Sequence, residues 1–143
     1  MRVNVSLFLG ATVAISCVNA DFWVVEEYPG QLGELGGNKL LAIPGASFTC
    51  DKFIQGSWPT VDTFSSPYTV ASGLCASPSD YDLYYEEDNI FTPGQHHWTM
   101  YEHNGDGSAL GTCSDASGNL VCGSYNAVIA SKFLQCHTAL CGT

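Results

Sequence analysis

The chain has very few positive charges. Against fourteen carboxylates stand only Arg2, Lys39, Lys52 and Lys132, and the formal net charge is −10 at pH 7. Nucleic-acid binding depends on lysine and arginine side chains that neutralise phosphates, and lytic peptides need a basic face to reach anionic lipid. The sequence therefore predicts neither a nucleic-acid partner nor a membrane partner.

Motifs for catalysis and metal binding are also missing. The chain has no Gly-x-Ser-x-Gly motif for a serine nucleophile, and no two cysteines have the C-x2-C spacing typical of zinc sites. The acidic turns at 104–108 and 114–119 lack the terminal glutamate of a calcium-binding loop. We therefore predict no enzyme activity, no metal and no cofactor.

An apolar run lies close to the N-terminus. Leu7–Ile15 follows the basic Arg2 and precedes Val18-Asn19-Ala20, which is typical of a signal-peptide cleavage site. The run is well short of the roughly 20 residues that span a bilayer. We expect residues 1–20 to be a signal peptide and residues 21–143 to form a single secreted, extracellular domain.

Removal of that signal peptide changes the cysteine count from odd to even. Cys17 leaves with the signal, and six of the seven cysteines remain. An even number in a short secreted chain predicts three disulfides, although the sequence does not choose among the pairings. The predicted disulfide cysteines are Cys50, Cys75, Cys113, Cys122, Cys136 and Cys141.

Strand and turn signals recur along the chain. Runs of aromatic and β-branched residues are separated by Pro-Gly, Asn-Gly and Asp-Gly turns. This pattern predicts an all-β fold, a small antiparallel β-barrel or sandwich stapled by disulfides. Residues 124–131 also have helical spacing, so one short helix is left open there. The expected strands include 21–28, 39–43, 46–53, 68–71, 81–88, 96–103 and 108–113.

The C-terminal segment 113–141 contains four of the cysteines, spaced C-x8-C-x13-C-x4-C. Asn104–Gly107, just before it, is the strongest hairpin signal in the chain, because Asn-Gly and Asp-Gly both accept positive φ at little cost. We expect this end of the protein to form a disulfide-locked β unit, with the remaining residues packed against it.

Several of these features together resemble the small secreted cysteine-rich proteins of fungi. They are the signal peptide, a body of about 120 residues, the W-x-M-Y run Trp98–Tyr101, Gly111–Cys113 and the closing Phe133–Cys136. The resemblance covers the signal and the last third of the chain. It implies an extracellular, disulfide-bonded, β-rich protein of the effector or elicitor kind, and it supplies no catalytic residue.

Aromatic residues are the candidates for ligand binding, because an exposed ring stacks on the apolar face of a sugar. Paired carboxylates could provide the two acids of a glycosidase only if they face each other across a cleft. The pairs considered are Glu26-Glu27, Glu86-Glu87-Asp88 and Asp80/Asp82, and a solvated acidic face explains them better. The candidate aromatic residues are Tyr81, Tyr84, Tyr85, Trp98 and Tyr101.

Histidines gather near the predicted hairpin. His96, His97 and His103 lie within eight residues, and His137 follows Cys136. On a regular strand His97 and His103 are about 20 Å apart, which is too far to share one ion. We interpret them as surface residues.

The sequence favours a secreted, non-enzymatic, effector-like or elicitor-like protein that acts on an extracellular partner, either a protein or a polysaccharide. The alternative is a small carbohydrate-binding protein or weak glycosidase that uses the tyrosines, the tryptophan and paired carboxylates.

Overall fold

The computed structural model of the chain describes residues 20–28, 39–87, 94–122 and 128–141. The predicted signal peptide, apart from Ala20, lies outside the described residues, as does the glycine-rich segment 29–38. The strands are β1 (Ala20–Tyr28), β2 (Lys39–Pro44), β3 (Val61–Asp62), β4 (Tyr68–Val70), β5 (Tyr81–Glu86), β6 (His97–Glu102), β7 (Ala109–Asp115), β8 (Asn119–Cys122) and β9 (Val128–Thr138).

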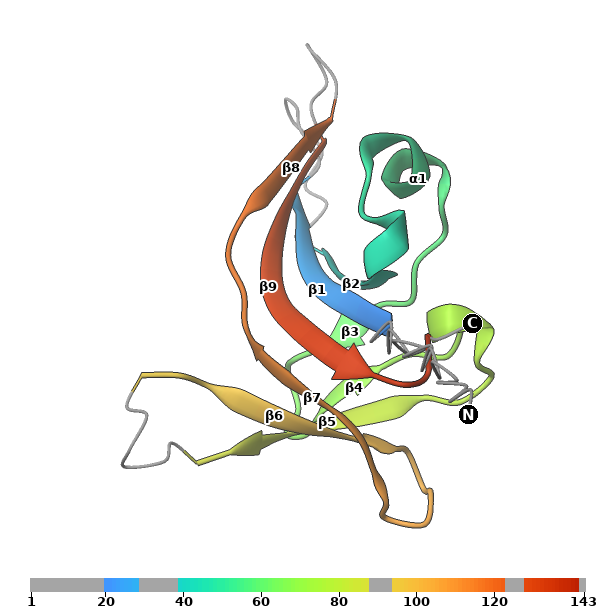
Figure 1. The fold of residues 1–143 in the computed structure, drawn as a ribbon, viewed down its shortest axis with the longest axis vertical. Coiled ribbons are helices and arrows are strands. Elements are labelled where there is room, and N and C mark those ends of the chain that lie inside the picture. Colours follow the sequence, from blue (N-terminus) through green and yellow to red (C-terminus); the bar gives the residue numbers. More distant parts are fainter. Residues whose placement is uncertain (1–19, 29–38, 88–93, 123–127, 142–143) are drawn as a thin grey trace, which may run out of the picture.

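These strands form an antiparallel, nearly closed eight-stranded barrel (Figure 1). The order is β2-β1-β9-β7-β6-β5-β4-β3, and β8 pairs with the first half of β9. Apart from β8, strands that follow one another in the chain are also neighbours in the barrel, and the last strand pairs with the first. The prediction of an all-β, disulfide-stapled fold is confirmed, and of the two architectures expected the barrel is found.

The barrel is closed by a short seam between β2 and the residues leading into β3. Leu41 and Thr60 form one antiparallel bridge, and the amide of Ala42 donates a hydrogen bond of 2.9 Å to the carbonyl of Pro59. These contacts join the two ends of the strand order. Closure of a barrel removes the unpaired strand edges that would otherwise bind other chains.

The barrel interior is filled by the apolar face of each strand. In β5, Tyr81 and Leu83 are buried, whereas Tyr84 and Glu86 are exposed. Asp82, between the two buried residues, is also buried, and Tyr85 is exposed, so the first half of β5 is covered and its second half is exposed. The main core cluster includes Phe22, Val24, Val70, Leu74, Tyr81, Leu83, Trp98, Met100, Cys113, Leu134 and Cys136.

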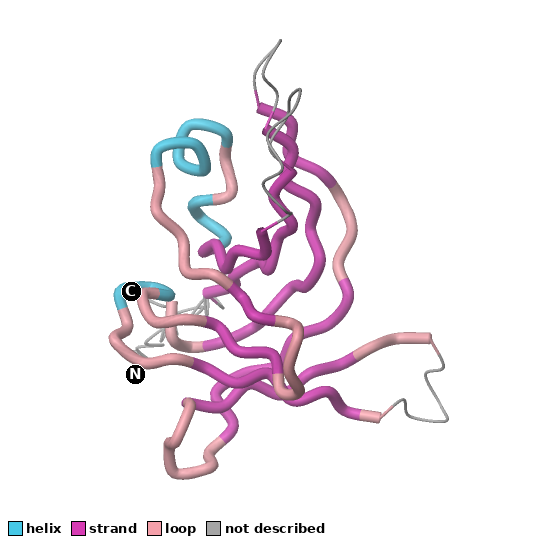
Figure 2. Tube along the Cα trace, turned by 180° about the vertical axis from the view of Figure 1, so that it is seen from behind, coloured by secondary structure: helices cyan, strands magenta, loops and turns pink. Residues whose placement is uncertain are grey.

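The expected strand 46–53 is wrong. The segment folds instead as the 3-10 helix η1 (Gly45–Ser47) and the α-helix α1 (Cys50–Gln55), which lie beside the barrel (Figure 2). The reason is the spacing of Phe48 and Phe53. Five residues apart, they would point to opposite faces of a strand, but the helical turn lets both pack against the same apolar cluster.

The short helix left open for residues 124–131 is not found in the part of that range that the structure describes. Residues 128–131 belong to β9, which pairs there with β1 on one side and β8 on the other. Ala130 is fully buried between them. A strand that is paired on both sides has its backbone N–H and C=O groups hydrogen-bonded, as they would be in a helix. Residues 124–127 lie outside the described residues.

The six predicted cysteines form three disulfides, as expected. Segment 113–141 includes the end of β7 and the whole of β8 and β9, and it contains one of the three bridges. The other two bridges connect this segment to η2 (Leu74–Ala76) and to α1, which lie beside the two ends of the barrel. The pairs are Cys113–Cys136 between β7 and β9, Cys50–Cys122 and Cys75–Cys141.

Candidate functional site

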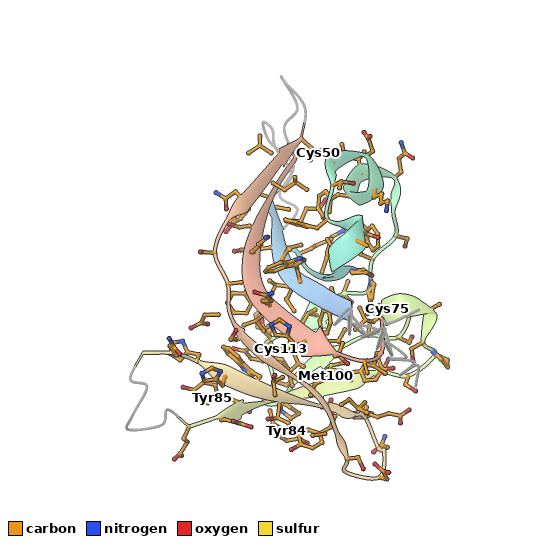
Figure 3. All side chains as sticks on the ribbon, viewed as in Figure 1. Cys50, Cys75, Tyr84, Tyr85, Met100 and Cys113 are labelled. Carbon is orange, nitrogen blue, oxygen red and sulfur yellow. A yellow bond between two sulfur atoms is a disulfide. The ribbon has the colours of Figure 1, made fainter. Side chains whose placement is uncertain are left out.

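The five candidate aromatic residues all lie on β5 and β6 but divide among three environments. Figure 3 labels two of them, Tyr84 and Tyr85, which project to different sides of the β5–β6 ribbon. Tyr81 is buried in the core. Tyr84 and Tyr101 contact each other on the outer face of the two strands. Tyr85 and Trp98 contact each other on the face that turns toward the barrel interior. The structure therefore gives two separate pairs rather than a single platform.

The outer pair lines a groove of about 630 Å³ beside the β6–β7 turn. We call it the hairpin groove. Three of its residues, Asn104, Gly105 and Gly107, belong to the turn predicted from the sequence, which is confirmed. The residues that line the groove are Asp82, Tyr84, Tyr101, Glu102, His103, Asn104, Gly105 and Gly107.

One wall of the hairpin groove is aromatic. The rings of Tyr84 and Tyr101 meet edge to face, with centroids 5.6 Å apart and planes at 82°. The two residues are diagonal neighbours, since Tyr84 pairs with Thr99 and Tyr101 pairs with Asp82. Tyr84 is 48% exposed, so a large part of its ring is accessible to a ligand.

The other wall is polar and contains a histidine–carboxylate pair. The Nδ1 atom of His103 lies 2.9 Å from Oδ2 of Asp82, and the hydroxyl of Thr69 donates to Oδ1 over 3.2 Å. The Asp82 side chain is only 10% exposed, whereas that of His103 is 47% exposed. Because a carboxylate only accepts, Nδ1 of His103 donates to Asp82, and Nε2 stays outside this hydrogen bond.

The turn that ends the groove is held by its own polar groups. Asn104 has a φ of 56° and Gly107 a φ of 83°, the left-handed conformations that Asn and Gly accept most readily. The amide of Ser108 donates to Asp106 over 2.8 Å, and this hydrogen bond lowers the pKa of Asp106 below its usual value. The turn is therefore a shaped end to the groove.

The inner aromatic pair lines a second cleft, of about 520 Å³, which opens onto the barrel core. We call it the barrel mouth. It draws residues from five strands and two loops, including Tyr68 and Phe133, which were not among the candidate aromatic residues. The residues that line it are Ser66, Tyr68, Leu83, Tyr85, His96, Trp98, Asp115 and Phe133.

A second histidine–carboxylate pair lies in the barrel mouth. The Nδ1 atom of His96 is 2.6 Å from Oδ2 of Asp115, and the His96 amide also donates to this oxygen over 3.3 Å. Both side chains are about half exposed. Each cleft thus combines two or more aromatic rings with one histidine oriented by an aspartate.

The carboxylate sets considered for acid–base chemistry are dispersed. Glu26 accepts a hydrogen bond from Tyr28, which raises the pKa of that tyrosine, and Asp80 accepts the amide of Ser72. Asp88 lies outside the described residues. Among the described residues, Asp82 and Glu102 line the same cleft, the hairpin groove.

Within the described ranges, no three His, Cys, Asp or Glu side chains come close enough to hold a metal ion. The same ranges contain no helix long and apolar enough to cross a membrane.

Comparison with known proteins gives no relative: no family model, curated protein or solved structure matches this chain. The fold itself defines a class, a small β-barrel with three disulfides. Disulfides of this kind persist in oxidising compartments, of which the extracellular space is the usual one for small domains.

Proposed function

We propose that this protein is secreted and acts outside the cell by binding rather than by catalysis, in the manner of fungal effectors and elicitors. The observation that carries the proposal is the hairpin groove, an exposed cleft on a covalently stapled barrel. The disulfides give the rigid scaffold that a binding site requires.

A polysaccharide is the partner that the groove fits best. The exposed ring of Tyr84 offers a face on which a sugar ring stacks. In the same groove, the Nε2 atom of His103 offers a further polar contact and the side chain of Asn104 both donates and accepts, which suits the hydroxyl groups around a sugar. The net charge of −10 disfavours an acidic polysaccharide, so we propose a neutral or basic one.

The contacts of Asp82 support the proposal of binding without hydrolysis. Both of its carboxylate oxygens already accept hydrogen bonds, one from Thr69 and one from His103. A glycosidase needs one carboxyl group to deliver a proton and the other to act as base or nucleophile. Asp82 orients His103 instead, and Glu102 accepts a hydrogen bond from Ser79.

A protein partner is the second candidate, and one observation favours it. Phe64, in the loop between β3 and β4, is fully exposed. A large aromatic side chain held in solvent is typical of an interface anchor.

Retention on insoluble cellulose, chitin and β-glucan tests the proposal. We expect retention on at least one polymer, a loss of about tenfold in Tyr84→Ala, and unchanged retention in Tyr28→Ala, another exposed tyrosine far from the groove. Release of reducing sugar from the retained polymer would contradict the non-catalytic assignment. Absence of retention on all three polymers would overturn the polysaccharide proposal, and capture of a protein that is lost in Phe64→Ser would replace it.

A further inference from the structure

The barrel mouth has a different composition from the hairpin groove, and the proposed function does not use it. Trp98 lies at its centre. The ring of Tyr68 stacks on that of Trp98, with centroids 6.1 Å apart and planes at 30°. The ring of Tyr85 meets Trp98 edge-on, with centroids 5.5 Å apart and planes at 64°. The centroid of the His96 ring lies 6.2 Å from that of Trp98. Rings at several inclinations around one cleft form a concave aromatic surface.

Concave aromatic surfaces have a specific chemical preference. The face of each ring carries partial negative charge, so a cation within about 6 Å of the centroid is attracted to it. Alkylated ammonium groups benefit most, because their methyl groups also contact the apolar rings and have no N–H that needs an acceptor. In the barrel mouth, Leu83 and Phe133 extend the apolar lining.

The charge of the cleft and of the whole protein also favours a cation. Asp115 is 47% exposed in its side chain, and its Oδ2 atom is bound to His96 at the rim. Beyond it, the formal net charge of −10 raises the local concentration of cations and excludes anions. The described residues offer no group of three metal ligands here, so an organic cation fits better than a metal ion.

We propose that the barrel mouth binds a small organic cation with a quaternary or methylated ammonium group. The cleft volume of about 520 Å³ is within the range of small-molecule sites. The cation stacks against Tyr68 and Tyr85, which pack on the buried Trp98, and Asp115 balances its charge. The lining of the barrel mouth is more aromatic and apolar than that of the hairpin groove, which favours an alkylated cation over a sugar. The site is independent of the polysaccharide proposal, and either can fail alone.

Titration of the secreted, oxidised protein with choline tests the inference. The control ligand is 3,3-dimethyl-1-butanol, which has the shape of choline but carries no charge. We expect choline and tetramethylammonium to shift the indole NH signal of Trp98 in NMR spectra, and the uncharged analogue to bind about tenfold more weakly. Equal affinity for choline and its analogue, or no binding of choline at millimolar concentration, would overturn the proposal.

Variants separate the ring contribution from the charge contribution. Tyr85→Phe keeps the ring and should keep binding, whereas Tyr85→Leu and Asp115→Asn should each weaken it about five- to tenfold. Tyr28→Ala is the matched control for loss of an exposed tyrosine. Near-ultraviolet circular dichroism verifies that each variant is folded. Unchanged affinity in folded Tyr85→Leu would refute the aromatic site, and displacement of choline by a neutral oligosaccharide would reassign the cleft to sugars.

Discussion

Replacement of Gly111 by alanine tests how closely β7 and β9 approach each other. A Cβ atom at this position would lie 2.3 Å from the carbonyl oxygen of His137 and 2.9 Å from Cβ of Thr138. Both obstacles belong to the neighbouring strand, and the nearer one is backbone. The overlap is relieved only when the two strands move apart.

The disulfide next to this position limits that movement. Cys113 and Cys136 are directly paired two residues along β7, and their bridge holds the strands together. We therefore expect Gly111→Ala to lower the free energy of unfolding by about 2–4 kcal/mol, the sum of overpacking and one or two weakened ladder hydrogen bonds. Urea unfolding followed by circular dichroism measures the change.

Gly107 supplies the matched control. An added Cβ there meets nothing within 4 Å, and the glycine is required only by its φ of 83°. Gly107→Ala should therefore cost only about 1 kcal/mol. In a background of Cys113→Ala with Cys136→Ala, the strands can separate, and the cost of Gly111→Ala should fall by about 1 kcal/mol or more. A cost below 1 kcal/mol for Gly111→Ala in the bridged protein would refute the close-approach explanation.

Three further changes have distinct expected outcomes. Replacing Cys75 and Cys141 by serine opens a loop of 66 residues and should lower the free energy of unfolding by about 4.4 kcal/mol on the chain-entropy relation; a loss below about 1 kcal/mol in urea would contradict it. Tyr81→Phe removes a part-buried hydroxyl hydrogen bond and should cost about 0.5–1.5 kcal/mol while leaving polymer retention unchanged. The hydrogen bond from Ser108 lowers the folded-state pKa of Asp106. The stabilising contribution of this hydrogen bond is therefore complete above the unfolded-state pKa and is lost as the pH falls through the folded-state pKa. An NMR titration that finds an unshifted pKa for the Asp106 carboxyl group would contradict this prediction.

The strands of the barrel could be predicted from the sequence because their signal is local. Aromatic residues between turn formers predicted a strand that begins at residue 81, and β5 (Tyr81–Glu86) is found there. The Asn104–Gly107 turn was likewise readable, since its conformation depends on residues adjacent in the chain. The strand expected at 46–53 was wrong because Phe48 and Phe53, five residues apart, pack on the same cluster only when the chain turns between them.

The candidate site could be predicted only in its residue types. Tyr84 and Tyr101 were named, but their contact depends on the register between β5 and β6, which places them on a diagonal. The same register brings His103 to Asp82. Histidine and aspartate were therefore identified separately and their pairing was missed, because residues 21 positions apart carry no local signal of contact. The disulfide pairing was hidden for the same reason.

The pairing of the first strand with the last also has a consequence for biosynthesis. Translation delivers β1 early, yet its longest partner, β9, is the final strand to be made. During that interval β1 has only β2 beside it, and the apolar face that carries Phe22 and Val24 stays uncovered. Completion of the barrel must then wait until synthesis of β9 has ended, and a chaperone has that whole interval in which to act.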